Sequence, residues 1–216
     1  MYQSHGWWFP DADTHFKDML TKSIKKGMGA DYQKAVRDAS LQHVKNFGVA
    51  LDVGANVGLW SRDLSNRFEK VIAFEPVNDF RECFVLNVTG TNVDVRACAL
   101  GAEDTRIDMI ITPGNTGHSH VNTHSMGRGP IPMWRLDTLQ LDRVDYVKID
   151  CEGYELNILH GAEQTLRQHR PIVVVEQKFH TDTGITQETR YGAMNLLLSW
   201  GARVLTQVRN DYVIGW

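Results

Sequence analysis

The chain has 216 residues, a formal net charge of −3 and a sequence pI near 6.3. This length fits one domain with some additional chain, and the charge excludes a protein that binds nucleic acid or an anionic membrane through bulk positive charge. Hydrophobic residues make up 42% and charged residues 23%, a balance that excludes a disordered tail protein. Any function therefore has to be sought in the motifs.

The cysteines point to a reducing compartment. Cys83, Cys98 and Cys151 are too few and too far apart for a disulfide framework or a Cys-x-x-Cys metal site. Residues 1–10 lack the basic and apolar regions of a signal peptide, and no run approaches 18 apolar residues. These features predict a cytoplasmic protein that does not bind membranes.

Along the chain, residues 1–30 are aromatic and irregular, and the apolar spacing of residues 31–47 predicts a helix capped by Asp31 and ended by Gly48. Beyond it, apolar runs alternate with helical spacing. Strands are predicted at Val49–Val53, Val71–Phe74, Val93–Leu100, Ile107–Ile111, Val144–Ile149, Ile172–Val175, Ala202–Val208 and Asp211–Trp216. Helices are predicted at Leu59–Phe68, Phe80–Val88, Tyr154–Leu166 and Thr189–Trp200, and a long polar loop at Thr112–Pro132.

This alternation predicts an α/β fold with a doubly wound, mostly parallel sheet covered by helices on both faces, a three-layer sandwich. The dipeptide Arg209-Asn210 is typical of a tight turn and predicts a terminal antiparallel hairpin. Residues 49–216 are expected to form the sheet domain. Residues 1–48 are expected to form a helical and aromatic cap of the same domain, either as packing or as a cover over a ligand.

The segment from Asp52 to Gly58 forms a glycine turn between a predicted strand and a predicted helix. Such turns let a ligand approach the backbone beside a helix N-terminus. In a dinucleotide fingerprint a second glycine makes room for the pyrophosphate, but this chain has Asn56 there. Asp52 would repel phosphates and would suit an ammonium group. These two departures favour S-adenosylmethionine over NAD.

Glu75 ends the next predicted strand, 17 residues after Gly58. An acidic residue in that position can accept hydrogen bonds from both hydroxyls of a ribose. Because dinucleotide sites share the feature, Glu75 indicates an adenosine-containing ligand without choosing its type.

A third group of acidic residues follows the strand Val144–Ile149. Asp150 and Glu152 are expected to face the same crevice as the glycine turn, because ligands of open α/β sheets bind outside the carboxyl ends of the strands. Glu155 is expected to bind the first turn of the following helix. Glu176 ends the next strand, and both a site role and a surface role stay open for it.

Together these blocks resemble the FkbM-type S-adenosylmethionine-dependent methyltransferases. The resemblance runs from about Asp31 to Glu176. It rests, in this order, on Asp-Val-Gly-Ala-Asn-Val-Gly, Phe-Glu-Pro, Lys-Ile-Asp-Cys-Glu-Gly-Tyr-Glu and the segment from Pro171 to Glu176. It implies the class I methyltransferase fold, with a seven-stranded sheet whose last strand is antiparallel. It also implies methylation of hydroxyl oxygens on small molecules or sugars.

The resemblance further implies a set of cofactor contacts. The methionine part is expected near the glycine turn, the ribose at Glu75 and the adenine at the end of the third strand. The expected residues are Asp52, Val53, Gly54, Ala55, Asn56, Gly58, Glu75, Pro76, Ala99 and Leu100.

Methyl transfer to a hydroxyl needs a group that accepts its proton. The candidates are Asp150 and Glu152 at the strand edge, and the three histidines of the polar loop, His118, His120 and His124. His120 is preferred among the histidines because it adjoins Ser119 of a segment similar to one in the family. The histidines could instead bind substrate, bind a metal or face solvent; no metal is predicted.

Two other functions remain open. An NAD-dependent oxidoreductase would share Glu75, although Asp52 and Asn56 disfavour it. A domain that binds S-adenosylmethionine without catalysis would share most of the same residues. Nucleic-acid methylation is disfavoured by the charge and by the lack of an Asn/Asp-Pro-Pro-Tyr/Phe segment. The expected partner is a small-molecule or sugar hydroxyl.

Overall fold

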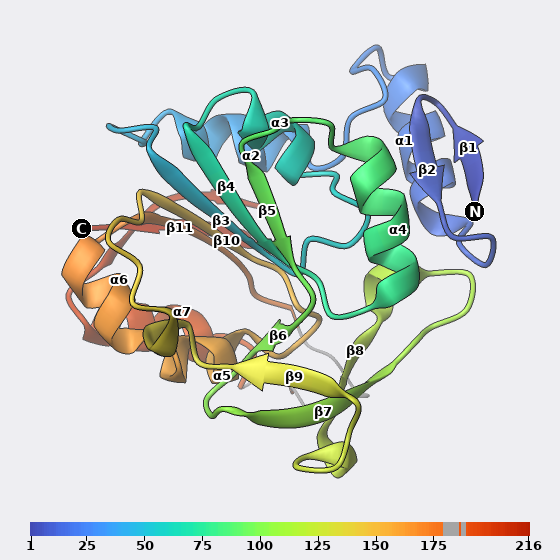
Figure 1. Cartoon of the computed structure of the whole chain (residues 1–216). Helices are drawn as coiled ribbons and strands as arrows, with labels where there is room; N and C mark the ends of the chain where they lie inside the picture. Colours follow the sequence, from blue (N-terminus) through green and yellow to red (C-terminus); the bar gives the residue numbers. More distant parts are fainter. Residues whose placement is uncertain (179–185, 187–188) are drawn as a thin grey trace.

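The computed structural model describes residues 1–178, 186 and 189–216, and its centre is a seven-stranded sheet (Figure 1). The strand order is β12–β13–β11–β10–β3–β4–β5. The strands are β3 (Val49–Val53), β4 (Lys70–Phe74), β5 (Val93–Arg96), β10 (Tyr146–Ile149), β11 (Ile172–Glu176), β12 (Arg203–Val208) and β13 (Asp211–Gly215). The predicted α/β fold with a mostly parallel sheet is confirmed.

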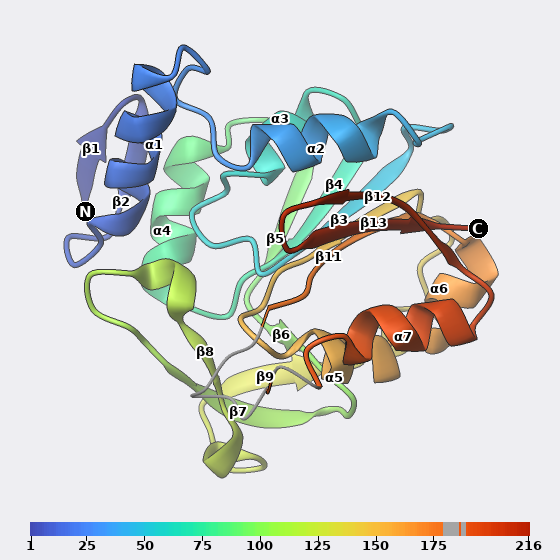
Figure 2. The same ribbon diagram turned by 180° about the vertical axis from the view of Figure 1, so that it is seen from behind.

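Helices cover both faces of this sheet, as both views show (Figures 1 and 2). One face carries α2 (Lys34–Leu41), α3 (Ser61–Ser65) and α4 (Asn78–Asn87), and the other carries α5 (Glu155–His160), α6 (Glu163–His169) and α7 (Gly192–Ser199). Successive side chains of β3 point to opposite faces of the sheet, and each face has its own hydrophobic cluster. Ala50 packs in the cluster below α2 and α3, whereas Leu51 and Val53 pack in the cluster below α5 to α7. Apolar runs that are buried on both faces therefore form the central strands.

The parallel register brings three strand ends to one edge. Val53, the last residue of β3, pairs with Phe74 of β4 and Ile149 of β10. The segments that leave these strands, Gly54–Gly58, Glu75–Val77 and Asp150–Gly153, therefore emerge side by side. At the other end of the sheet β12 and β13 pair antiparallel, with Arg209 and Asn210 between them, and β13 is antiparallel to β11.

The polar segment 112–132, predicted as a loop, contains regular structure. A second, four-stranded sheet has the order β6–β9–β7–β8. It comprises β6 (Ala99–Leu100), β7 (Thr105–Ile110), β8 (His120–Asn122) and β9 (Ile131–Trp134). The prediction of a bare loop was wrong because β8 is a short strand of mixed polarity whose pairing with β7 is long-range. The predicted strand 93–100 is divided into β5 and β6 for the same reason: its second part joins the smaller sheet.

The helix predicted over residues 31–47 is much shorter in the structure, where α2 spans Lys34–Leu41. Gln33 precedes it with a left-handed φ of 51°, which stops the helix from starting earlier. Asp31 does not cap the helix; its carboxylate binds Arg37 instead. The helix predicted over 154–166 is also interrupted, at Gly161, where an added Cβ would overlap the carbonyl oxygen of Gly101.

The N-terminal residues form a hairpin of β1 (Tyr2–Ser4) and β2 (Trp7–Phe9), followed by α1 (His15–Lys25). The backbone of Trp8 is held by Asn87 of α4, which accepts its N–H at 2.7 Å and donates to its carbonyl at 2.9 Å. Phe9, Phe16 and Leu20 are buried in a cluster that also contains Val57, Leu59 and Cys83. Among the described residues, no helix has both the length and the apolarity needed to cross a lipid bilayer.

Candidate functional site

A cleft of about 840 Å³, counting its open mouth, lies where β3, β4 and β10 end. Eight of the ten predicted cofactor residues line it: Val53, Gly54, Ala55, Asn56, Glu75, Pro76, Ala99 and Leu100. Asp150 and Glu152, predicted as catalytic, line the same cleft. The sequence motifs thus meet in one place, while the described lining does not include Asp52, Gly58 or His120.

Eight of the ten predicted cofactor residues therefore lie at the cleft, and two lie behind it. Gly58 is one of the two: its φ is 91°, and an added Cβ would meet Val88 and Phe84 of α4 at 2.5 and 3.0 Å. Gly58 thus lets the turn pack against α4 and leaves ligand contact to its neighbours. Gly54, with φ 78°, is needed for another close approach, because a Cβ there would overlap the backbone carbonyl of Asp150.

Asn56 and Glu75 both line the cleft and are joined by a hydrogen bond. Asn56 has a left-handed φ of 50°, and its backbone N–H donates to one carboxylate oxygen of Glu75 at 2.8 Å. The other oxygen of Glu75 accepts the N–H of Val77 at 2.8 Å. Burial raises the pKa of Glu75 to about 7, although both backbone hydrogen bonds oppose that rise. Each oxygen keeps a further lone pair for a ligand hydroxyl.

Asp52 is the second residue behind the cleft. Its side chain is fully buried and accepts a hydrogen bond from Ser61 Oγ at 2.6 Å, while Lys148 Nζ lies 3.4 Å from its other oxygen. The parallel register pairs Lys148 with Asp52, so the two side chains share a face of the sheet. The carboxylate is therefore neutralised within the protein and does not reach the position where a ligand ammonium was expected.

Lys148 connects this pair to the cleft. Its ammonium donates to the carbonyl of Gly54 at 2.9 Å and lies 4.0 Å from Asp150. Burial alone would lower the pKa of Lys148, but the charges of Asp52 and Asp150 outweigh it and raise the pKa. One buried cation thus holds the glycine turn and the acidic turn together.

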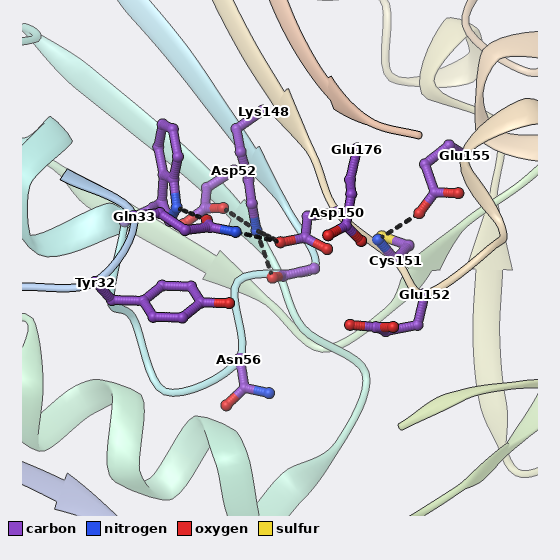
Figure 3. Close-up of polar contacts among 12 residues, drawn as sticks. Tyr32, Gln33, Asp52, Asn56, Lys148, Asp150, Cys151, Glu152, Glu155 and Glu176 are labelled. Atoms are coloured by element: carbon purple, nitrogen blue, oxygen red, sulfur yellow. Dashed lines mark hydrogen bonds and ion pairs between the residues drawn. The ribbon is translucent and has the colours of Figure 1, made fainter. Parts of the chain in front are cut away.

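Asp150, Glu152 and Glu176 form an acidic cluster, and the first two of them line the cleft (Figure 3). Each offers a carboxylate oxygen within 4.8 Å of the others. Lys178 supplies a cation to this cluster, 3.3 Å from Glu152 and 2.8 Å from Glu176. Burial, followed by the charge of Asp150, raises the pKa of both Glu152 and Glu176. The cluster therefore contains carboxylates that are stronger bases than an exposed glutamate.

The Lys178 ammonium contacts two of these three carboxylates, Glu152 and Glu176. Among the described residues, the histidines of segment 112–132 do not make a three-ligand cluster with each other. Glu155 has a local role, as expected: it accepts the backbone N–H groups of Cys151 and Gly153 at 2.8 and 3.2 Å.

His120 does not lie where the sequence suggested. It belongs to β8, is 8% exposed, and its Nδ1 lies 3.0 Å from the carbonyl oxygen of His118. Its neighbours Ser119 and Val121 line the cleft, and alternation along the extended chain directs the side chain of His120 to the other side. Of the three predicted catalytic residues, Asp150 and Glu152 therefore line the cleft and His120 does not.

Four residues that shape the site have no motif in the sequence that indicates their role. Gln33 accepts a hydrogen bond from Trp60 Nε1 at 2.6 Å and donates to Asp150 at 3.5 Å. Tyr32, Trp60 and Lys148 line the cleft. The lysine could have been noticed as a charged residue inside an apolar strand, whereas nothing in the sequence indicates that Gln33, 117 positions away, reaches Asp150.

Comparison with known proteins identifies the family. Residues 52–204 match the model of the methyltransferase FkbM domain, which is more than half of the chain. The solved structure of an FkbM methyltransferase from Methylobacillus flagellatus KT is similar, with 19% identity and a TM-score of 0.48 over 79% of this chain. The chain spans 44% of the length of that protein. No curated protein matches the sequence.

Two further structures share the fold. A predicted methyltransferase from Streptococcus mutans, solved in complex with SAH, has 9% identity and a TM-score of 0.51, covering 84% of this chain and 94% of that one. A predicted O-methyltransferase from Klebsiella pneumoniae has 14% identity and a TM-score of 0.50, covering 94% and 90%. With its family match and the cleft at the carboxyl ends of its strands, the chain belongs to the FkbM methyltransferase family and uses S-adenosylmethionine as its cofactor.

Proposed function

We propose that the protein transfers a methyl group from S-adenosylmethionine to a hydroxyl oxygen of a small molecule or sugar, with Glu152 as the group that accepts the hydroxyl proton. The observation that carries this proposal is the position of Glu152: it is buried, lines the cofactor cleft and belongs to a cluster of three carboxylates. A base in this position can deprotonate a hydroxyl only if that hydroxyl enters the same cleft.

The residues of the cleft fit the cofactor by their chemistry. The buried carboxylate of Glu75 suits ribose hydroxyls, and the apolar pair Ala99 and Leu100 suits an adenine ring. The acidic cluster with Asp150 suits the positive charges of a sulfonium and an ammonium group. When bound, S-adenosylmethionine supplies a methyl group that is activated by its positively charged sulfur.

The protein's own contribution is position and proton acceptance. Gln33 and Lys148 hold Asp150, and Lys178 holds Glu152, so both carboxylates are oriented before an acceptor arrives. The raised pKa of Glu152 makes it a better proton acceptor for a hydroxyl than an exposed glutamate would be. The free thiols Cys83, Cys98 and Cys151 support action in the cytoplasm, where thiols stay reduced.

The test begins with calorimetric titration of S-adenosylhomocysteine and of NADH. We expect only the former to bind; binding of NADH alone would support the oxidoreductase alternative. Methyl transfer from labelled S-adenosylmethionine is then measured over a set of hydroxylated small molecules and sugars, and the product is identified by NMR. A label on nitrogen or carbon would contradict O-methylation.

Variants separate catalysis from binding. Glu152→Gln should abolish transfer and leave the affinity for S-adenosylhomocysteine within about twofold, because the amide keeps the shape but cannot accept the proton. Glu163→Gln on the exposed side of α6 is the matched control and should behave like the wild type. Equal turnover by Glu152→Gln would remove Glu152 from the mechanism. Cofactor binding with no transfer to any acceptor would favour the non-catalytic alternative.

A further inference from the structure

A second cleft lies beside the first one, between α1, the start of α2 and the turn that joins β12 to β13. It encloses about 1000 Å³, counting its open mouth. The segments that line it are distant in sequence: Met19 and Lys22 come from α1, whereas Val208 and Arg209 come from the terminal hairpin. Tyr32 lines both clefts, so its side chain forms part of the wall between them.

The rim of the second cleft is positively charged. Lys22, Lys26 and Arg209 line it, and in the described part of the chain none of the three is within 4.0 Å of a carboxylate. Asp31 also lines the cleft, but Arg37 donates to both of its carboxylate oxygens, at 2.7 and 2.6 Å. The remaining charge at the rim therefore attracts an anion.

The two remaining charged residues of this cleft, Lys34 and Asp211, leave its rim positively charged. Lys34 pairs with Asp38 on the exposed side of α2. Burial, followed by the charge of Asp150, raises the pKa of Asp211 to about 7, so this carboxyl carries less than its full negative charge near neutral pH.

Part of the lining of the second cleft is apolar. Met19, Val36 and Val208 contribute aliphatic or thioether side chains, and Val36 is 2% exposed. Thioether and aliphatic groups accommodate varied apolar shapes and offer no strong hydrogen bonds. A molecule that fits this cleft therefore has an apolar body as well as an anionic group.

The wall between the clefts leads to the acidic cluster. The ring of Tyr32 packs edge-on against Phe16, with centroids 5.2 Å apart, and its hydroxyl points toward the side of the site that holds Asp150 and Glu152 (Figure 3). Gln33, the next residue, has a left-handed backbone and binds Asp150 directly. A strained residue at such a wall is typical of a functional position.

We propose that the second cleft binds the methyl acceptor, and that the acceptor is a small amphipathic anion, with a carboxylate, phosphate or sulfate group held by Lys22, Lys26 and Arg209 and a hydroxyl that reaches past Tyr32 to Glu152. This inference rests on the proposed function, because it assigns the acceptor of that reaction. It places the anionic group and the reacting hydroxyl at opposite ends of the acceptor.

The experiment measures binding to the full chain saturated with S-adenosylhomocysteine, with octyl phosphate as the anionic probe below its micelle concentration. Octyltrimethylammonium has the same chain length and the opposite charge. We expect octyl phosphate to bind and the cation to bind at least about tenfold more weakly. Lys22→Glu/Lys26→Glu should weaken octyl phosphate about tenfold, because two attractive contacts become repulsive.

The matched control is Lys17→Glu/Lys25→Glu, which makes the same charge change on exposed positions of α1 that do not line the cleft. It should bind octyl phosphate like the wild type. Equal loss in both double variants would overturn the proposal, since the effect would then be the bulk charge of α1. Co-sedimentation with phosphatidylglycerol vesicles that both double variants abolish would point to a membrane surface and would also overturn it.

The two proposals can fail separately. If S-adenosylhomocysteine does not bind, the proposed function fails at its first step. If it binds with unchanged affinity in all variants but octyl phosphate does not bind the wild type, the second cleft is not an anion site and only this inference is overturned. Tyr32→Ala should change the affinity for octyl phosphate more than that for S-adenosylhomocysteine; the opposite result would assign Tyr32 to the cofactor cleft alone.

Discussion

The ammonium of Lys148 and the carboxylate of Asp52 form an ion pair across two adjacent strands, 3.4 Å apart, and both side chains are almost completely excluded from solvent. The same ammonium donates a hydrogen bond to the carbonyl of Gly54, a residue that lines the cofactor cleft. Removing one partner of a buried pair leaves the other charge without compensation, whereas exposed pairs contribute little.

Lys148→Met should therefore lower the free energy of unfolding by about 3–5 kcal/mol, as measured by denaturant titration. The affinity for S-adenosylhomocysteine should also fall, because Gly54 and Asp150 lose their common partner. Arg167→Met, which removes an exposed pair with Glu163, is the control and should change stability by less than about 1 kcal/mol. Similar losses in the two variants would show that burial does not decide the strength of the pair.

Gly54 and Gly127 provide a second comparison, because their φ angles are 78° and 77° while their surroundings differ. Gly127→Ala meets nothing within 4 Å and should lose about 1–2 kcal/mol, the strain of a left-handed alanine. Gly54→Ala should lose clearly more, because its Cβ overlaps the Asp150 carbonyl. Denaturant titration of both variants measures the difference, and equal losses would contradict the close approach of the two turns.

Much of this arrangement follows from the sequence. The apolar runs at Val49–Val53 and Ile172–Val175 predicted central strands, and parallel strands bring their carboxyl ends to one edge, which is why eight of the predicted cofactor residues line one cleft. A strand pattern does not say which face of the sheet a polar residue takes when both faces are covered. Asp52 was therefore expected at the ligand, although it faces Ser61 and Lys148.

Other features depend on long-range contacts that leave no local signal. The hydrogen bond from Gln33 to Asp150 and the ion pair of Lys178 with Glu152 join residues far apart in sequence. The position of His120 depends on β8, a three-residue strand whose existence is decided by pairing with β7. Local propensity and periodicity do not record such pairings.

Glu75 should make cofactor binding depend on pH. Its pKa of about 7 means that this carboxyl is about half protonated at neutral pH. Hydrogen bonds from ribose hydroxyls are stronger to the ionised form, so binding lowers the pKa and releases up to about half a proton at pH 7. Titration of S-adenosylhomocysteine in buffers with different ionisation enthalpies measures this release.

Glu75→Gln removes the titrating group and should abolish that release. The same variant should weaken binding, because an amide cannot accept from both Asn56 and Val77 through two oxygens. A proton release that is unchanged in Glu75→Gln would assign the effect to another group of the site.

Glu75, Glu155 and Asp211 should also set the stability of the cofactor-free protein. Burial, the largest cause in each case, raises their pKa values to about 7, 6 and 7. An acid with a raised pKa in the folded state binds more protons folded than unfolded, so the free energy of unfolding should fall as pH rises from about 4.5 to about 7. Thermal unfolding across this range measures the slope. A melting temperature that rises instead would contradict the burial of these carboxyls.

Glu152 should control the pH dependence of methyl transfer. The proton acceptor must be ionised, so kcat/KM should rise with pH through an apparent pKa well above the usual range of a glutamate. Burial and the charges of Asp150 and Glu155 raise this pKa, and Lys178 opposes the rise. Asp150→Asn should therefore move the midpoint down and Lys178→Met should move it up, each by about one pH unit.

The midpoint of the pH profile separates this effect from any loss of maximal rate, and the control variant Glu163→Gln should leave the midpoint unchanged. Shifts of the same sign in Asp150→Asn and Lys178→Met would mean that the titrating base is not Glu152, because only a group lying between a carboxylate and an ammonium responds to their removal in opposite directions.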